Sequence, residues 1–228
     1  MNLNLDLAAF LTSVALIAGY HVFLAVKVRN DPYYTVHSAN VIARRAWVEH
    51  VMSEPSRDVM AVQTLRNSTM AATFLASTAV LLIVGTLTLI TQSEHISETW
   101  HLLSLTGSDY AELWIAKVLM LLLAFIVAFF SFAMVLRLLN HVLYMLNVPS
   151  AKRTHPALQP EQVAWRLNRA GFFYTVGMRA YYIAVPLVFW LFGPLFLLVA
   201  SAVLVIVLYR LDRSAGAPGL DTGVSGIC

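Results

Sequence analysis

The stretch that decides the fold is LWIAKVLMLLLAFIVAFFSFAMVL, residues 113–136. It contains no proline or glycine, and the pattern continues without a helix breaker to Leu146. An apolar run of about 18 or more residues is long enough to cross the hydrocarbon core of a bilayer as a helix. Residues 113–136 are therefore predicted to span a membrane.

The composition of the whole chain supports the same conclusion. Hydrophobic residues make up 59% of the 228 positions and charged residues 12%, and the mean hydropathy is +0.73. Soluble domains are roughly half apolar and about one quarter charged. A water-soluble fold is therefore excluded, and the length accommodates four spans and their connections as one domain.

Three other stretches have the length and apolar character of spans: 5–26, 68–91 and 180–209. The first lacks the basic start of a signal peptide and is interpreted as a retained helix. The last contains Pro186 and Gly193-Pro194, which predict a kink near mid-membrane. The predicted fold is an all-α, four-span transmembrane bundle over residues 1–212, followed by a flexible tail, 213–228.

Residues 27–67 and 137–179 are predicted to be cytoplasmic elements, and the polar residues 92–112 an external link. An amphipathic helix is expected around residues 41–52, because apolar residues recur there at helical spacing. The helix that contains the second span is predicted to begin after Ser53-Glu54-Pro55 and to run unbroken to Thr91. Such a helix is about 57 Å long, whereas the hydrocarbon core is about 30 Å thick. Helices two and three should therefore extend into the cytoplasm.

Lysine and arginine set the predicted orientation. Residues 27–66 contain six of them, residues 137–179 contain six more, and residues 92–112 contain none. Basic loops stay in the cytoplasm, so both termini are expected outside, in a bacterial inner (plasma) membrane. Arg210 and Arg213 argue against this orientation at one end, and the other contrasts outweigh them.

Several motifs resemble a known family. They are AVQTLRNSTMAAT (61–73), Tyr20-His21, the block from Pro32 to Val48, and LNRAGFFYTVGMRAYYIAVPLVFWLFGP (167–194). In these motifs the chain resembles the domain-of-unknown-function family 599, multi-span membrane proteins of plants and bacteria. The resemblance implies a membrane location and a fold. It brings no activity, so it assigns no catalytic residue.

Polar residues at one membrane depth form the main candidate site. Guanidinium groups suit phosphate and carboxylate, and the nearby acids Glu49, Glu54 and Asp58 are too few to pair with every arginine. The simpler alternative is that these arginines extend to the lipid head groups and set the topology, without forming a binding site. The candidates for binding an anion or anionic lipid are Arg44, Arg45, Arg66, Asn67, Arg137, Arg169 and Arg179.

Histidines provide a second candidate. His21 and His141 are expected in one leaflet, as two axial ligands of haem b would require, although ordinary interfacial histidines have the same pattern. His95 and His101 flank Glu94 and Glu98 on the outer link, where a solvated surface is the simpler interpretation than a weak metal site. No cofactor or metal is predicted, and the lone Cys228 forms no internal disulfide.

The leading hypothesis is a non-enzymatic membrane protein that binds an anion or anionic lipid, with an oligomeric ion or solute pathway as an extension. One alternative is a haem-binding or accessory subunit of a membrane redox complex. Another is a membrane enzyme acting on a lipid-like substrate, for which no motif is present. The expected partners are lipids and further copies or subunits, through small residues of span two (Ala71, Ala72, Ala76 and Gly85), and no nucleic acid.

Overall fold

The structure is a computed structural model that describes residues 3–31, 34–54, 58–91 and 111–213. Residues 92–110 of the predicted link 92–112 and residues 214–228 of the predicted tail 213–228 lie outside the described residues. Within those ranges the chain is all-α, with two short 3-10 turns between residues 150 and 158. The α-helices are α1 (Leu3–Asn30), α2 (Val36–Ser53), α3 (Asp58–Thr91), α5 (Ala111–Leu146), α6 (Pro160–Phe192) and α7 (Pro194–Asp212).

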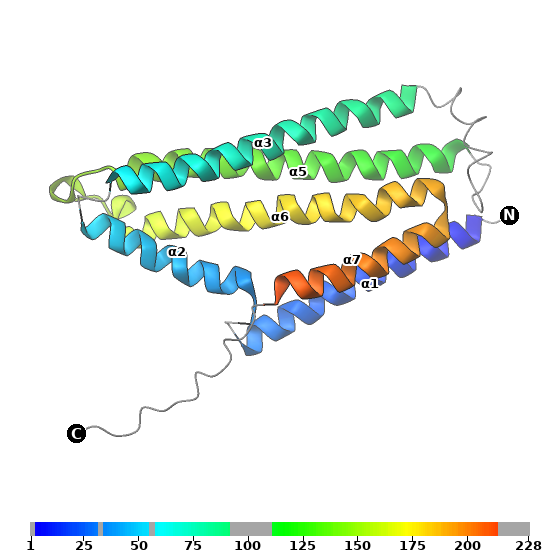
Figure 1. Cartoon of the computed structure of the whole chain (residues 1–228), viewed down its shortest axis with the longest axis horizontal. Helices are drawn as coiled ribbons and strands as arrows, with labels where there is room; N and C mark the ends of the chain where they lie inside the picture. Colours follow the sequence, from blue (N-terminus) through cyan, green and yellow to red (C-terminus); the bar gives the residue numbers. More distant parts are fainter. Residues whose placement is uncertain (1–2, 32–33, 55–57, 92–110, 214–228) are drawn as a thin grey trace, which may run out of the picture.

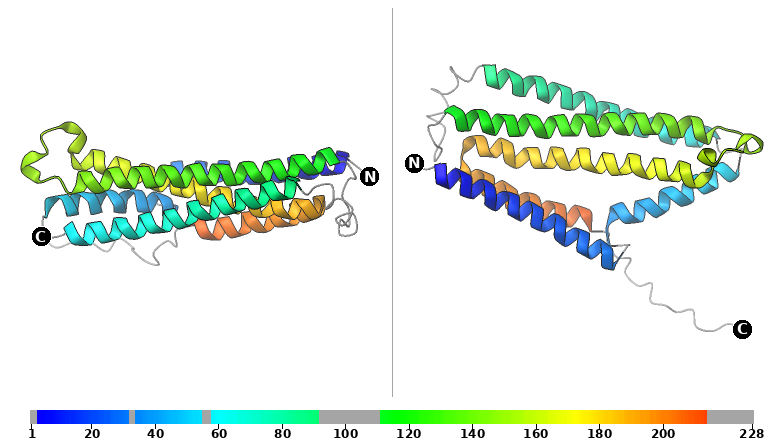
Figure 2. Two further views of the ribbon diagram at one scale, coloured as in Figure 1. Left: turned by 90° about the horizontal axis from the view of Figure 1, so that it is seen from above. Right: turned by 180° about the vertical axis from the view of Figure 1, so that it is seen from behind.

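The long helices lie side by side in a row. Helix α5 packs between α3 and α6, and α7 and α1 form a pair on the other side of α6 (Figure 1). The view from above shows that the row is shallow (Figure 2). Helix α2 fills one end, against α6 and α5. We call this the basic end, because the helix segments that meet there carry most of the arginines. These are Arg44 and Arg45 of α2, Arg66 of α3, Arg137 of α5, and Arg166 and Arg169 of α6.

A tight turn at Gly193 separates α6 from α7. Gly193 has φ 145° and ψ 165°, a conformation open essentially to glycine alone. Its N–H donates to the Trp190 carbonyl over 3.1 Å, and Pro194 starts the next helix, where its missing N–H costs nothing. The prediction of one kinked span over 180–209 is wrong, because the chain reverses at Gly193, whereas α6 continues through Pro186.

Among the described residues, five helices rather than the expected four are long and apolar enough to cross a membrane: α1, α3, α5, α6 and α7. Helix α1 begins at one end of the row, and α7, which starts near that end, finishes about halfway along it, close to the start of α2 (Figure 1). If all five cross, the two termini face opposite sides, whereas the predicted placement of both termini outside requires an even number of crossings. Arg210 opposed the positive-inside rule in the four-span arrangement. With a fifth crossing it would lie on the same side as the other arginines and agree with that rule.

Helix lengths locate the membrane boundary. Helix α7 has 19 residues, about 28 Å, which matches the hydrocarbon core of about 30 Å. Helices α3 and α5 have 34 and 36 residues, so each is longer than the hydrocarbon core is thick, as predicted. Their extension into the cytoplasm stays a prediction. The amphipathic helix α2 is also confirmed, and it buries Val48, Val51 and Met52 against α3, α5 and α6.

The small residues of α3 are divided between two environments. Ala72 and Ala76 are buried within the chain, whereas Ala71 and Gly85 are exposed. Part of the face predicted to join other subunits therefore packs inside the protomer, and an oligomer stays a prediction.

An ion pair joins three helices at the end opposite the basic end. Lys117 Nζ of α5 lies 2.9 Å from Asp6 Oδ1 of α1, with side-chain exposures of 6% and 2%. Trp190 of α6 donates its indole N–H to the same oxygen over 3.1 Å, and its ring lies 5.3 Å from Lys117 Nζ. Removing one partner of a buried pair leaves an uncompensated charge, which is far more costly than removing both.

We expect Lys117→Met to destabilise the protein by about 3 kcal/mol, because Asp6 is then buried without a counter-charge. The double variant Asp6→Asn with Lys117→Met should recover most of this loss, because the asparagine oxygen still accepts from Trp190. Apparent melting temperatures in detergent check both. A double variant no more stable than Lys117→Met would contradict this account.

We also expect the two ends of the chain to face opposite sides of the membrane. In a Cys228→Ser background, Asn4→Cys should react with an impermeant thiol reagent added outside the cell, whereas Arg213→Cys and Lys152→Cys should react only after permeabilisation. Labelling of Arg213→Cys from outside would restore the four-span topology.

Candidate functional site

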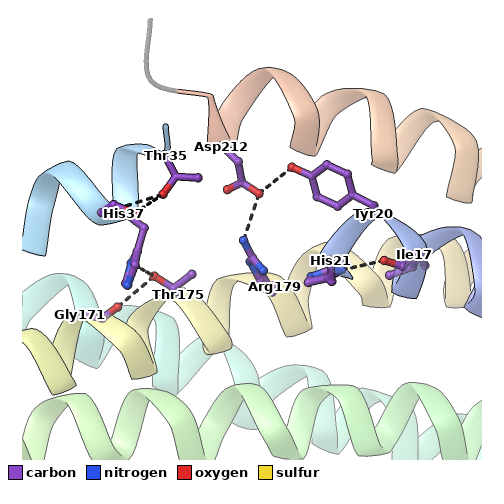
Figure 3. Close-up of polar contacts among 10 residues, drawn as sticks. Ile17, Tyr20, His21, Thr35, His37, Gly171, Thr175, Arg179 and Asp212 are labelled. Atoms are coloured by element: carbon purple, nitrogen blue, oxygen red, sulfur yellow. Dashed lines mark hydrogen bonds and ion pairs between the residues drawn. The ribbon is translucent and has the colours of Figure 1, made fainter. Parts of the chain in front are cut away.

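An acidic residue at the end of α7 joins three helices at the membrane boundary. Asp212 Oδ2 lies 3.0 Å from Arg179 Nη2 of α6 and accepts a hydrogen bond from the Tyr20 hydroxyl of α1 over 2.8 Å. Figure 3 shows these side chains meeting between α1, α6 and α7. Arg179 is thus neutralised by a carboxylate that only the reversal at Gly193 brings to it.

Helix α2 docks antiparallel on α6 through polar contacts. Thr35 caps α2 by accepting from the Ser38 N–H over 3.2 Å, and it pairs with Arg213 in an isolated β-bridge. His37 Nδ1 lies 3.2 Å from Thr175 Oγ1 (Figure 3). One turn of α2 further on, Asn168 Nδ2 donates to the Val41 carbonyl over 3.2 Å.

Arg44 follows on the same face of α2 and reaches over Gly171 of α6. A Cβ atom built at Gly171 would overlap the guanidinium carbon and both terminal nitrogens of Arg44. Any larger residue at 171 would therefore displace the guanidinium. By contrast, a Cβ built at Gly85 meets nothing within 4 Å.

The Arg44 guanidinium lines a cavity of about 260 Å³ between α2, α3, α5 and α6. The floor is apolar and buried, and includes Val135 and Leu139 of α5. The rim is more exposed and includes Ser68 and Ala71 of α3. The remaining lining residues are Leu167, Ala170, Gly171 and Tyr174 of α6. We call this cavity the Arg44 pocket.

Arg44 lacks full compensation for its charge. Its Nη1 atom is buried, and no described residue offers it a hydrogen bond. Burial lowers the pKa of Arg44 below its ordinary value, although an arginine stays protonated at any physiological pH. A buried guanidinium with an unused donor beside a cavity is a favourable place for a ligand oxygen.

The other predicted arginines do not line this pocket. Arg45 is exposed and pairs with Glu49 over 3.1 Å. Arg169 is exposed and lies over the rings of Trp165 and Phe173, at 5.2 and 5.9 Å. Arg66, Asn67 and Arg137 are exposed on α3 and α5. Of the seven predicted residues, Arg44 alone lines this pocket, whereas Arg45 and Arg179 each pair with a carboxylate.

Sequence reasoning missed His37 and Gly171. His37 lies seven residues before Arg44, which places both on one face of α2 two turns apart. The spacing of seven residues therefore predicts that the two side chains share one helix face. Nothing in the sequence indicated that Gly171 is the place where the guanidinium rests.

The two predicted haem ligands lie on helices that α6 separates in the row (Figure 1). His21 Nδ1 donates to the Ile17 carbonyl over 2.8 Å, and His141 is exposed on α5. The described residues contain no group of three His, Cys, Asp or Glu side chains that could hold a metal ion. The histidines and acids of the outer link lie outside the described residues.

The apolar helices and the charged end define a multi-span integral membrane protein. The family model described as "Protein of unknown function, DUF599" matches residues 8–217, and the chain belongs to this family. This confirms the resemblance seen in the sequence motifs. No curated protein and no solved structure matches the chain significantly.

We expect Asp212→Asn to lower stability by about 1 kcal/mol, because half-buried Arg179 loses its counter-charge while Tyr20 keeps an oxygen to donate to. The measurement is the apparent melting temperature in detergent. Arg210→Gln, on the exposed side of the same helix end, is the matched control. Equal melting temperatures for the two variants would show that the pair does not stabilise the junction.

Proposed function

We propose that this protein binds the anionic head group of a membrane lipid in the Arg44 pocket, as a non-enzymatic function. The observation that carries the proposal is the buried Arg44 Nη1, which has no partner among the described residues and lies at the wall of a cavity. A phosphate oxygen would accept the unused hydrogen bond and neutralise the charge in one step.

The depth of the pocket agrees with a lipid head group. If α7 spans the hydrocarbon core, then Asp212 and its partner Arg179 mark the boundary. Gly171 and Tyr174 precede Arg179 on α6 by eight and five residues, which is about 12 and 8 Å. The headgroup layer extends about 5–8 Å beyond each side of the core. Tyr174 then lies at the outer edge of the headgroup layer and Gly171 a few ångströms beyond it, so Arg44 is within reach of a head group that projects from the membrane surface.

The walls of the pocket favour a lipid over a free anion. Arg44 is the one charged residue in the lining, and most of the other lining residues are apolar. The rim between α3 and α6 carries partly exposed Ser68, Ala71 and Tyr174, with the apolar side chains of Met70 and Phe74 exposed beside it on α3. A lipid can place its phosphate on Arg44 while its chains stay among these apolar groups.

We expect Arg44→Gln to weaken binding of phosphatidylglycerol tenfold or more, because a charge-assisted hydrogen bond contributes about 1.5–3 kcal/mol. Arg45→Gln, the exposed neighbour, should leave the affinity unchanged. Gly171→Ala keeps every charge but displaces the guanidinium, and it should weaken binding in the same way, with Gly85→Ala as its control. Titration of short-chain lipids into the protein in a neutral detergent measures these affinities.

Two further titrations identify the source of the anion. Phosphatidylcholine reports on the net charge of the head group, and glycerol 1-phosphate reports on the head group without chains. Tight, Arg44-dependent binding of glycerol 1-phosphate would assign the pocket to a soluble anion. Equal affinity of the wild type and Arg44→Gln for phosphatidylglycerol would end the proposal.

A further inference from the structure

The strongest feature outside the anion contact is His37, which lies beside the Arg44 pocket. It is half-buried on α2 and contacts α6 at Thr175, one turn from the Gly171 position over which Arg44 lies. Side chains of a helix lean towards its N-terminus, so Arg44 leans towards His37. The two contact points on α6 are four residues, or about 6 Å, apart.

Hydrogen bonding fixes the state of the imidazole. Thr175 Oγ1 donates its single proton to the Gly171 carbonyl over 3.0 Å. In that arrangement it accepts from His37, so we assign the proton of the neutral ring to Nδ1. The other nitrogen, Nε2, is then the one that takes up a second proton.

The charges around His37 oppose that second proton. Arg44 of its own helix and Arg179 of α6 are positive, and Asp212 of α7 is the acidic group that counters them. Asp212 is already shared with Arg179 and Tyr20. Burial and the two guanidinium groups together lower the pKa of His37, although Asp212 acts in the opposite direction.

We propose that His37 is a proton-binding site coupled to the Arg44 pocket, so that the protein takes up an anionic head group and a proton together. This inference rests on the proposed function. Because the contact points of Arg44 and His37 on α6 are about 6 Å apart, an anion on Arg44 would be close enough to His37 to replace part of the missing negative charge. By linkage, each ligand then strengthens binding of the other by the same factor.

The sign of the pH dependence follows from the geometry. The anion raises the pKa of His37 relative to the free protein, so the bound state holds more protons between the two pKa values. Affinity for the anion therefore increases as the pH falls, by up to tenfold per pH unit for one proton. Across an effective dielectric constant of about 20 to 40, a separation of about 8 Å gives an increase of about fivefold to thirtyfold in total.

The test uses the full-length protein in neutral detergent and short-chain phosphatidylglycerol as the probe. A phosphodiester lacks the second ionisation near pH 6 that a phosphomonoester has, so the probe keeps its charge. Wild-type affinity should rise about fivefold or more between about pH 8 and pH 5. His37→Gln should bind with little pH dependence, whereas His50→Gln, an exposed histidine of the same helix, should behave as the wild type.

Proton uptake is a second measurement that needs no variant. Calorimetric titrations near pH 6 in two buffers of different ionisation enthalpy should show that binding takes up a fraction of a proton. Binding without proton uptake, or a His37→Gln variant with the pH dependence of the wild type, would overturn the coupling. If such binding still depended on Arg44, the proposed function would stand alone; if phosphatidylglycerol did not bind, both would fall.

Discussion

The turn at Gly193 is the constraint on which the rest of the arrangement depends. Its φ of 145° reverses the chain, so that α7 returns along α6 and α1. The length of α7 then places Asp212 beside Arg179 and Tyr20, and the bridge between Arg213 and Thr35 ties the end of α7 to the start of α2. Without the reversal, α2 would lose this anchor and Arg179 would have no described acidic partner. One backbone conformation therefore sets both the number of spans and the position of the polar junction.

The positive charges of the described arginines are balanced by different kinds of contact. Arg179 has a carboxylate, and Arg169 lies over aromatic rings. Arg153 donates to the carbonyls of Met52 and Val148 at 2.7 Å each, at the ends of α2 and α5, where the helix dipole favours a cation. Arg44 is half-buried, and its Nη1 has no hydrogen-bond partner among the described residues. A buried polar group without a partner costs roughly 1–3 kcal/mol, which a suitable ligand would recover.

The sequence predicted the helices well because apolar runs and charge counts are local signals. It could not separate a kink from a reversal at Gly193-Pro194, because both interrupt the same apolar pattern and only the φ of the glycine differs. The arginines expected at one membrane depth do not share one pocket, because most of them lie on other helix faces. Residues two apart on a helix point in nearly opposite directions, about 160° apart. Three predicted arginines each lie two residues from a pocket residue: Arg66 from Ser68, Arg137 from Val135 and Arg169 from Leu167. Depth follows from sequence position, whereas the face that meets a neighbour is decided by tertiary packing.

Helix α2 connects the pocket to the membrane-spanning pair α1 and α7. Its far end is fixed by apolar packing of Val48 and Val51, whereas its first two turns are held mainly by polar contacts through Thr35, His37 and Val41. Such polar contacts each contribute only about 0.5–1.5 kcal/mol, and their strength depends on the charges around them. A change of charge at Arg44 or His37 therefore acts on the more easily displaced half of α2. Because that half is bridged to Arg213, the effect of a ligand in the pocket would reach α7 through the backbone of Thr35 rather than through the long helices α3 and α5.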